Sequence, residues 1–172
     1  PISHMRTVAL RVEHRTVGEP ALGLGTGTPR LSWQNADAPD GFVQVSAEVE
    51  LTRTRWGGQA STETVTLSGS DQVLVAWPVA PLVSRERAVV RVRATGADGS
   101  VSHWSDPAVV EAGLLGGSDW APATFVTPTE IGGIVAPAPA LVASFDVPGR
   151  VTAARLHITA HGWYEASING VK

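Results

Sequence analysis

The sequence contains no cysteine, and lysine is nearly absent: 12 of its 13 basic residues are arginine and Lys172 is the exception. Without cysteine, the chain has no disulfide framework, thiolate metal site or cysteine nucleophile. No apolar run approaches the roughly 18 residues that a membrane-spanning helix needs. Charged residues are also few, at 17%, and the net charge is −3. Composition therefore offers no electrostatic argument for a nucleic-acid or membrane partner.

The 172 residues can hold one complete β-sandwich and part of another. Residues 1–4, Pro-Ile-Ser-His, have the form of a cloning remnant and are left out of the fold reasoning. If Met5 is the native start, a strand follows directly with no signal peptide, which favours the cytoplasm. If Met5 is an engineered start, secretion stays open.

The organising stretch of the sequence is 91–105, RVRATGADGSVSHWS, which predicts a strand, a tight turn and a Trp-Ser corner. Small apolar residues alternate with arginines from Ser84 to Thr95, as a half-buried strand requires. Asp98-Gly99 predicts a two-residue hairpin turn, because such turns need positive φ angles. Further strands are predicted at 7–14, 31–33, 42–52, 62–67, 73–77 and 108–114, with a loop at 18–29.

The strand at 42–52 carries the clearest alternation in the chain. Its odd-numbered residues from Val43 to Leu51 are predicted to face the core, and Gln44 and its even-numbered neighbours to face solvent. The segment 62–67 is β-branched and is predicted as an edge strand. Seven or so short strands within about 110 residues predict an all-β, immunoglobulin- or fibronectin-III-like sandwich at 5–114, with very little helix.

A seam rich in glycine and proline follows at 115–139 and predicts a linker or long loop. The residues after it, 140–172, are predicted to begin a second, incomplete β-sandwich. Its strands are expected at 141–147, 155–160 and 163–168, before an Asn169-Gly170 turn with no return strand. The resulting unpaired edge near Ile168 is expected to drive self-association.

The order of these motifs resembles the N-terminal region of bacterial α-L-rhamnosidases. The resemblance spans nearly all of the chain from Arg6 onward, with 155–170 as its most specific part. It rests on the following stretches: GLGTGTPRLSW at 23–33, the long strand at 43–51, PLVSRERAVVRVR at 81–93 with SHWSDP at 102–107, EAGLLGGSDW at 111–120, and RLHITAHGWYEASING at 155–170. Two departures are Ala88 and Val90, where the family usually has aromatic residues; Trp77 is the candidate to fill that volume.

The resemblance implies an accessory region of a glycoside hydrolase that releases terminal rhamnose. In that family catalysis belongs to a helical toroid far C-terminal of this region, so this chain is expected to be inactive alone. Inverting hydrolysis needs two carboxyl groups about 6.5–9.5 Å apart. No such pair stands out, because Asp40 and Asp98 are turn residues and Asp106 and Asp119 lie in loop and linker. No catalytic residue, cofactor or metal is predicted. The expected partners are the remaining enzyme domains and rhamnosylated carbohydrate.

Two patterns resemble ligand sites only superficially. His157 and His161 have the spacing of a helical metal pair, but on a strand four residues span about 13 Å, too far for one ion. Glycines 23, 25 and 27 resemble a phosphate loop, yet no helix follows that could hold an anion. A plain strand and a plain loop are the preferred interpretations.

Two hypotheses concern aromatic side chains. Trp163, Glu165 and Asn169 could contact a sugar, with Tyr164 beside them; the alternative is that alternation divides the aromatics between core and surface while Asn169 serves the turn. Separately, the indole of Trp104 could stack with the outward-facing arginines of the 84–95 strand, as in the Trp-Ser box of cytokine-receptor fibronectin domains. The alternative there is a tryptophan buried at the sandwich edge.

Two functions of another class compete with the enzyme-region hypothesis. The first is a free-standing carbohydrate-binding or adhesion module that shares only the sandwich. The second is an intact small protein whose last strands pair with a second copy.

Overall fold

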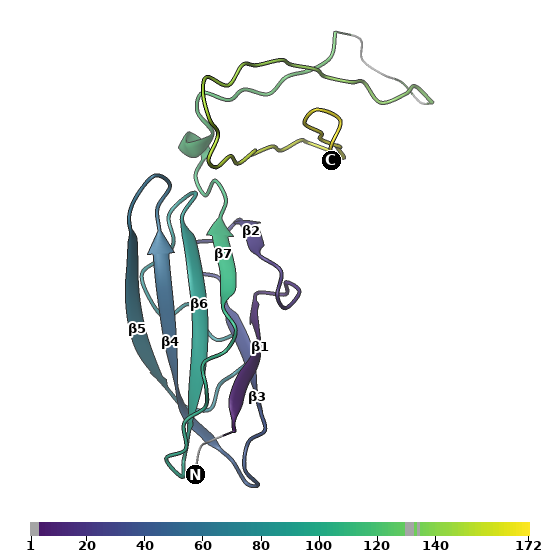
Figure 1. Ribbon diagram of the computed structural model, residues 1–172. Coiled ribbons are helices and arrows are strands. Elements are labelled where there is room, and N and C mark those ends of the chain that lie inside the picture. The colour runs from purple at the N-terminus through teal and green to yellow at the C-terminus, as the bar shows by residue number, and fades with distance from the viewer. Residues whose placement is uncertain (1–3, 130–132, 134) are drawn as a thin grey trace. The chain divides into compact units, whose positions relative to one another are not determined.

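The computed structural model describes residues 4–129, 133 and 135–172, and divides into two compact units, Pro1–Asp119 and Trp120–Lys172. The first unit contains every β-strand of the described residues (Figure 1). In chain order the elements are β1 Arg6–Val12, β2 Ala21–Leu24, β3 Leu31–Ala36, β4 Gln44–Thr54, β5 Ala60–Ser68, β6 Arg87–Gly96, β7 Ala108–Ala112 and the 3-10 turn η1 Gly117–Trp120.

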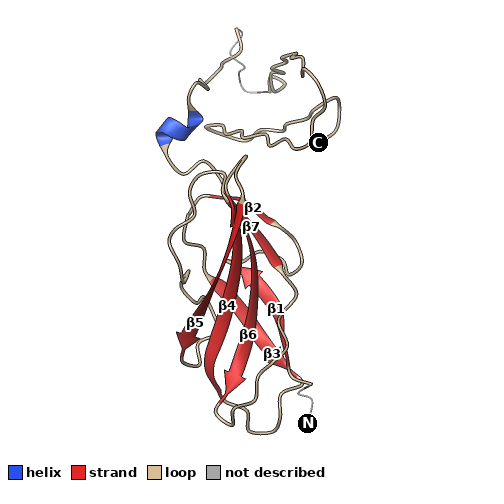
Figure 2. Ribbon diagram, turned by 60° about the vertical axis from the view of Figure 1, so that its left-hand side comes forward, coloured by secondary structure: helices blue, strands red, loops and turns tan. Residues whose placement is uncertain are grey.

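The strands form two sheets, which confirms the all-β immunoglobulin-like sandwich. β1 pairs with β3 in a two-stranded sheet, and the other five strands form a sheet in the order β2-β7-β6-β4-β5. All pairings are antiparallel except β2 with β7. Figure 2 shows β1 and β3 behind the larger sheet. The predicted edge strand at 62–67 is part of β5, which lies at one end of the order.

The core forms where the apolar alternation of β4 and β6 meets the small sheet. Val49 and Leu51 of β4 and Val90 and Val92 of β6 are completely buried. Trp33 of β3 lies in the same buried cluster. Each such side chain contributes about 1.5–3 kcal/mol relative to full exposure. The alternation of β6 that the sequence predicts is therefore confirmed.

Ala88 and Val90, the two departures from the family pattern, lie in the core together with Trp77. Both residues are completely buried, and Trp77 belongs to the same core cluster. The indole N–H of Trp77 donates to the carbonyl of Ala80 at 3.2 Å, so the ring is held in place within its own loop. An aromatic side chain outside the strands thus contributes to the same core, and that Trp77 fills the volume beside Ala88 and Val90 stays a prediction.

The prediction for the start of β4 is wrong. Gln44 is 4% exposed, whereas Val43 and Val45 are 57% and 43% exposed. The register between β4 and β6 shifts here, because Gln44 pairs with Gly96 and Ser46 with the residue before it. One extra residue in β4 forms a β-bulge and reverses the alternation on its N-terminal side.

Two further predictions fail because they depend on distant partners. The segment predicted as a loop at 18–29 contains β2, which pairs in parallel with β7. The segment 73–77 is not a strand, since Leu74 has a φ of 51° and only Val75 makes a bridge, to Leu31. Neither outcome follows from local alternation.

The turn after β6 also differs from the expected two-residue type. The Gly96 amide donates to the Ser100 carbonyl, and the Gly99 amide donates to the Gly96 carbonyl. Residues 97–99 therefore form a three-residue loop, in which Gly99 alone has positive φ, at 80°. The carboxylate of Asp98 accepts from the amide and hydroxyl of Ser100 and stabilises the loop.

The predicted strands in the second unit do not form among the described residues. Pairing there is limited to one bridge, Ile168 with Val171, closed by the Asn169-Gly170 turn with φ angles of 52° and 79°. That turn is confirmed. Apolar side chains such as Phe145 are exposed. Alternating residues form stable strands only when their apolar face packs against another layer. That this unit begins a second sandwich stays a prediction.

Among the described residues, no helix has the length and apolar character needed to cross a membrane.

Candidate functional site

The Trp104 side chain lies over the outer face of β6 and contacts two arginines. The guanidinium carbons of Arg91 and Arg93 lie 4.8 Å and 4.7 Å from the indole ring centroid. Both distances are within the roughly 6 Å limit for cation–π attraction. The predicted Trp-Arg stack is confirmed, and Trp104 is half-buried under it.

Two serine hydroxyls hold the tryptophan segment against β6. The hydroxyls of Ser102 and Ser105 accept from the backbone amides of Ala94 and Val92 at 2.9 Å and 3.1 Å. The two serine amides donate back to the carbonyls of the same β6 residues. The intervening backbone of His103 instead bonds to the chain around β1. These hydrogen bonds fix the segment 102–105 along β6 and place Trp104 on the outer face.

The arginines of the stack are also ion-paired. Arg91 contacts Glu50 at 2.7 Å, and Arg93 contacts Glu48 at 2.5 Å. The hydrogen bonds that Arg91 donates to the Glu50 carboxylate raise the pKa of Arg91 further above its ordinary value. Each guanidinium is thus occupied by a carboxylate and a ring, so the stack is a structural anchor with no unpaired charge for a ligand.

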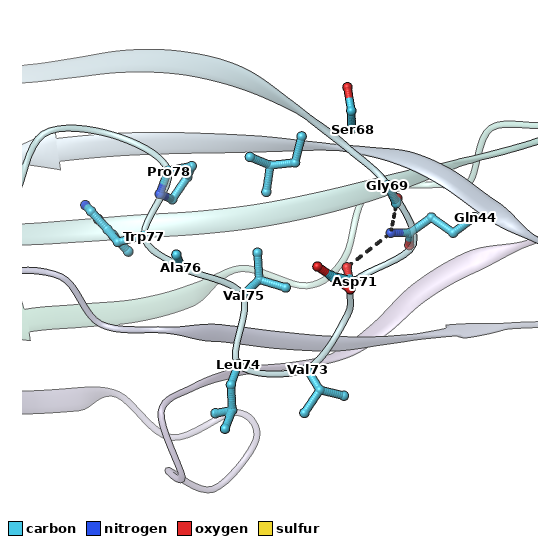
Figure 3. Close-up of a pocket in the computed structure, with 11 residues that line it drawn as sticks. Gln44, Ser68, Gly69, Asp71, Val73, Leu74, Val75, Ala76, Trp77 and Pro78 are labelled. Carbon is cyan, nitrogen blue, oxygen red and sulfur yellow. Dashed lines mark hydrogen bonds between the residues drawn. The ribbon is translucent and has the colours of Figure 1, made fainter.

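A hollow of about 370 Å³ opens beside Gln44, at the end of β5 (Figure 3). The Gln44 side-chain oxygen accepts from the Trp33 indole and the Asn35 amide, each at 3.2 Å. Its nitrogen donates to the carbonyls of Gly69 and Asp71 at 3.4 Å and 3.3 Å. All four bonding positions of the buried amide are therefore satisfied within the protein. The other lining residues are Leu67, Ser68, Val73, Leu74, Val75, Ala76, Trp77 and Pro78.

A second hollow, of about 430 Å³, is lined by two acidic residues, Glu63 and Glu86. Arg53 lies between them, 2.9 Å from Glu86 and 3.7 Å from Glu63. Burial favours a higher pKa for Glu86, but hydrogen bonds from Arg53 and the Val83 amide outweigh it and lower the pKa below its ordinary value. A carboxyl held ionised in this way cannot serve as a general acid near neutral pH.

Comparison with known proteins assigns the family. Residues 7–116 match the family described as the Rha78A-like, N-terminal immunoglobulin domain. The chain belongs to this family. The match covers the sandwich and the Trp104 anchor, and the resemblance to the N-terminal region of α-L-rhamnosidases is confirmed.

Curated relatives of this Rha78A-like domain extend the match to the second unit. An α-L-rhamnosidase of Streptomyces avermitilis is 34% identical over 195 residues, covering 99% of this chain and 18% of the relative. Another, of Alteromonas sp., is 28% identical and covers 87% of this chain and 17% of the relative. The chain therefore spans less than a fifth of the length of these relatives.

Solved structures agree with the fold of the Rha78A-like domain. The α-L-rhamnosidase of Aspergillus terreus shares 37% identity with a TM-score of 0.60, over 74% of this chain and 14% of that structure. The Streptomyces avermitilis α-L-rhamnosidase, solved in complex with L-rhamnose, shares 33% identity with a TM-score of 0.57, over 68% of this chain and 11% of that structure.

A polar junction forms where the Rha78A-like match ends. The carboxylate of Asp119 accepts hydrogen bonds from the hydroxyl of Ser84 and, at 2.8 Å, from the amide of Gly116. The Ser84 hydroxyl in turn accepts from the Leu115 amide. The Ser84 hydrogen bond, followed by that of Gly116, lowers the pKa of Asp119. The sequence assigned Asp119 only to the linker, because its partner is 35 residues away.

The candidate sugar contacts all lie in the second unit. Trp163 is fully exposed, and Glu165 forms an ion pair with Lys172 at 2.6 Å. Asn169 occupies the turn, as the simpler interpretation expects. The hydroxyl of Tyr164 donates to the carbonyl of Ile158. Sugar contact by Trp163, Glu165 and Asn169 stays a prediction.

The two patterns interpreted as strand and loop also have positions in the structure. The His161 ring stacks on Phe125, with centroids 4.4 Å apart. Within the described residues, no group of three or more potential ligands gathers around His157 or elsewhere to hold a metal. Gly27 packs against the backbone of Leu82, and the Leu82 amide donates to its carbonyl at 2.7 Å. The glycine therefore permits a close backbone approach.

Proposed function

We propose that this chain is a non-catalytic accessory region of an α-L-rhamnosidase. In this role the sandwich packs against the remaining domains of the enzyme and helps to present rhamnosylated substrate. The observation that carries the proposal is the match along 99% of this chain to an α-L-rhamnosidase of which it covers only 18%. The bulk of that relative, including any catalytic machinery outside the matched part, has no counterpart here.

Three acidic groups of the sandwich support a non-catalytic role. Glu48 and Glu50 are bound to the arginines of the Trp104 stack, and Glu86 is bound to Arg53. Glycoside hydrolysis needs one protonated and one ionised carboxyl group facing the bond that breaks. These carboxylates face cations of their own chain, an arrangement that stabilises a fold and provides no proton.

The experiment is an assay of the chain with a nitrophenyl α-L-rhamnoside. The chain is expected to release no nitrophenol above the buffer rate, while a complete α-L-rhamnosidase in the same buffer releases it readily. Turnover by the chain that persists after repeated purification would overturn the proposal. The genomic reading frame provides the complementary test: several hundred further residues with a helical-toroid pattern support it, and a stop codon after Lys172 contradicts it.

Substrate presentation is tested through the exposed Trp163. Titration of the chain with L-rhamnose, followed by tryptophan fluorescence and chemical-shift changes, is expected to show weak saturable binding that W163A removes. A matched variant, W56A, changes another exposed tryptophan, in the β4–β5 hairpin. Equal binding by the unmodified chain and W163A, or no binding at all, would remove presentation from the proposal.

A further inference from the structure

Among the strands that the structure describes, β5 has a neighbour on only one side. It is the last strand in the sheet order, next to β4, as the left-hand rim of the sheet in Figure 1 shows. Its pairing with β4 runs without a register shift from Ser46 with Ser68 to Thr54 with Ala60. The result is a regularly paired, nine-residue edge strand, whereas β2 at the other end of the order has four residues.

The backbone groups at this free edge belong to the even-numbered residues. In an antiparallel pair, residues alternate between bonding to the partner and pointing away from it. The Gly69 amide donates to the Val45 carbonyl at 2.7 Å, which assigns the odd-numbered residues to the β4–β5 ladder. The outward N–H and C=O groups are those of Ala60, Thr62, Thr64, Thr66 and Ser68.

The other side of β4 gives the same assignment. Ser105 bonds to the Val92 backbone, so the even-numbered residues of β6 point away from β4. The odd-numbered residues of β6 then bond to their even-numbered partners in β4, such as Glu48 opposite Arg93. The odd-numbered residues of β4 are left to bond to β5, as the Gly69 contact indicates.

The sequence of β5 has only one of the features that usually prevent edge pairing, a charge on its core-facing side. Proteins protect exposed edges with lysine, proline, bulges or inward charges. β5 reads ASTETVTLS and has no lysine, proline or glycine. Its one charged residue, Glu63, lies opposite the buried Leu51 of β4, and Arg53 of the same chain counters its charge at 3.7 Å.

We propose that β5 pairs antiparallel with β5 of a second copy, about a two-fold axis at Thr64, so that the two larger sheets become one continuous sheet. In this register Thr62 lies opposite Thr66 and Ala60 opposite Ser68, so every outward-facing residue meets another. Glu63 lies opposite Val65 and not another glutamate, which avoids a like-charge pair. In this register the core-facing side chains of both copies lie on the same face of the joined sheet.

The partner strand is β5 of a second copy, because the register about Thr64 pairs the β5 sequence with itself and places no two like charges opposite each other. This interface does not depend on the proposed rhamnosidase role. It also differs from the predicted edge near Ile168, since it lies entirely within the first unit.

The first test measures mass by light scattering during size-exclusion chromatography over a range of concentrations. The chain is expected to reach twice its 17.9 kDa and to return to one copy on dilution. T64P removes an outward N–H and leaves the β4 ladder intact, so it should be monomeric with an unchanged circular dichroism spectrum. T64V retains the N–H and should still dimerise. A monomer at every concentration, or a dimer that survives T64P, overturns the proposal.

The second test uses the absence of native cysteine and does not depend on the folding of T64P. Hydrogen-bonded antiparallel partners have Cα atoms about 5.5 Å apart, within disulfide range. T64C should therefore form a cross-linked dimer under mild oxidation. T62C should cross-link with T66C but not with itself, and R11C on β1 should remain uncross-linked. Equal cross-linking of T62C alone and T64C, or of R11C and T64C, would contradict the register.

Discussion

Arg53 and Glu86 form a two-point ion pair across the end of the core, with nitrogen–oxygen distances of 3.1 Å and 2.9 Å. Glu86 is 3% exposed, and Arg53 also donates to the carbonyls of Ala80 and Pro81, each at 3.0 Å. The pair therefore connects β4 with the loop before β6, at Ala80 and Pro81 and at the last loop residue, Glu86. The strongest stability predictions concern this contact.

Removal of one partner is expected to destabilise the sandwich strongly. R53A leaves the buried carboxylate of Glu86 without its cation, and such losses cost about 3–5 kcal/mol in the free energy of unfolding. The measurement is urea denaturation followed by circular dichroism. R53M/E86L removes both charges and should recover most of the loss. A destabilisation by R53A below about 1 kcal/mol would show that the pair is not desolvated.

The same pair predicts how stability depends on pH. The pKa of Glu86 is lower in the folded state than the roughly 4.3 of an unfolded chain. Its stabilisation is therefore fully present above the unfolded pKa and is lost as pH falls through the folded pKa. The urea concentration at the unfolding midpoint should decrease as the pH is lowered below about 4, and this decrease should be smaller in E86Q. Equal pH slopes for E86Q and the unmodified chain would contradict the assignment.

The Trp104 stack makes a smaller contribution. R91K and R93K retain positive charge opposite Glu50 and Glu48 but lose the planar group over the indole. Each is expected to cost about 0.5–1 kcal/mol in the free energy of unfolding, and both should cost less in a W104A background. R11K on β1, which is exposed, is the matched control. Additive losses in the W104A background would show that the arginines act without the ring.

Gly27 and Gly25 form a matched pair for testing close backbone approach. A Cβ atom at Gly27 would lie 2.4 Å from the carbonyl oxygen of Leu82, whereas one at Gly25 meets nothing within 4 Å. G27A is therefore expected to destabilise the sandwich by about 1–3 kcal/mol, and G25A to change it little. Thermal unfolding of both variants checks this. A destabilisation by G25A equal to that by G27A would contradict it.

Local pattern was sufficient to predict the strands with strict alternation. In β6, Ala88 and Val90 are both buried, as their positions in the alternating pattern require. The outward-facing arginines of the same pattern also led to the prediction of the Trp104 stack. The Asn169-Gly170 turn also follows from its two residues alone. In these cases the determining interactions are local or lie one strand away.

The failures occur where a distant partner decides the geometry. The bulge beside Gln44 depends on the register opposite Gly96, and β2 depends on a parallel partner 88 residues later, as Leu24 pairs with Ala112. The partners of Gln44 come from β3 and from the turn after β5, so its burial has no signature in the sequence of β4. In the second unit, alternation without a facing layer produced no strands.

The hydrogen bonds that hold the segment 102–105 along β6 affect how the sandwich unfolds. One short segment bonds to β6 through its serines and to the chain around β1 through His103, so neither sheet can separate without releasing the other. The amide hydrogens of Val92 and Ala94 are shielded by side-chain hydroxyls in place of a neighbouring strand. We expect these amides to exchange with solvent only in the global opening event, together with those of β1, so that the two sheets form a single cooperative unit.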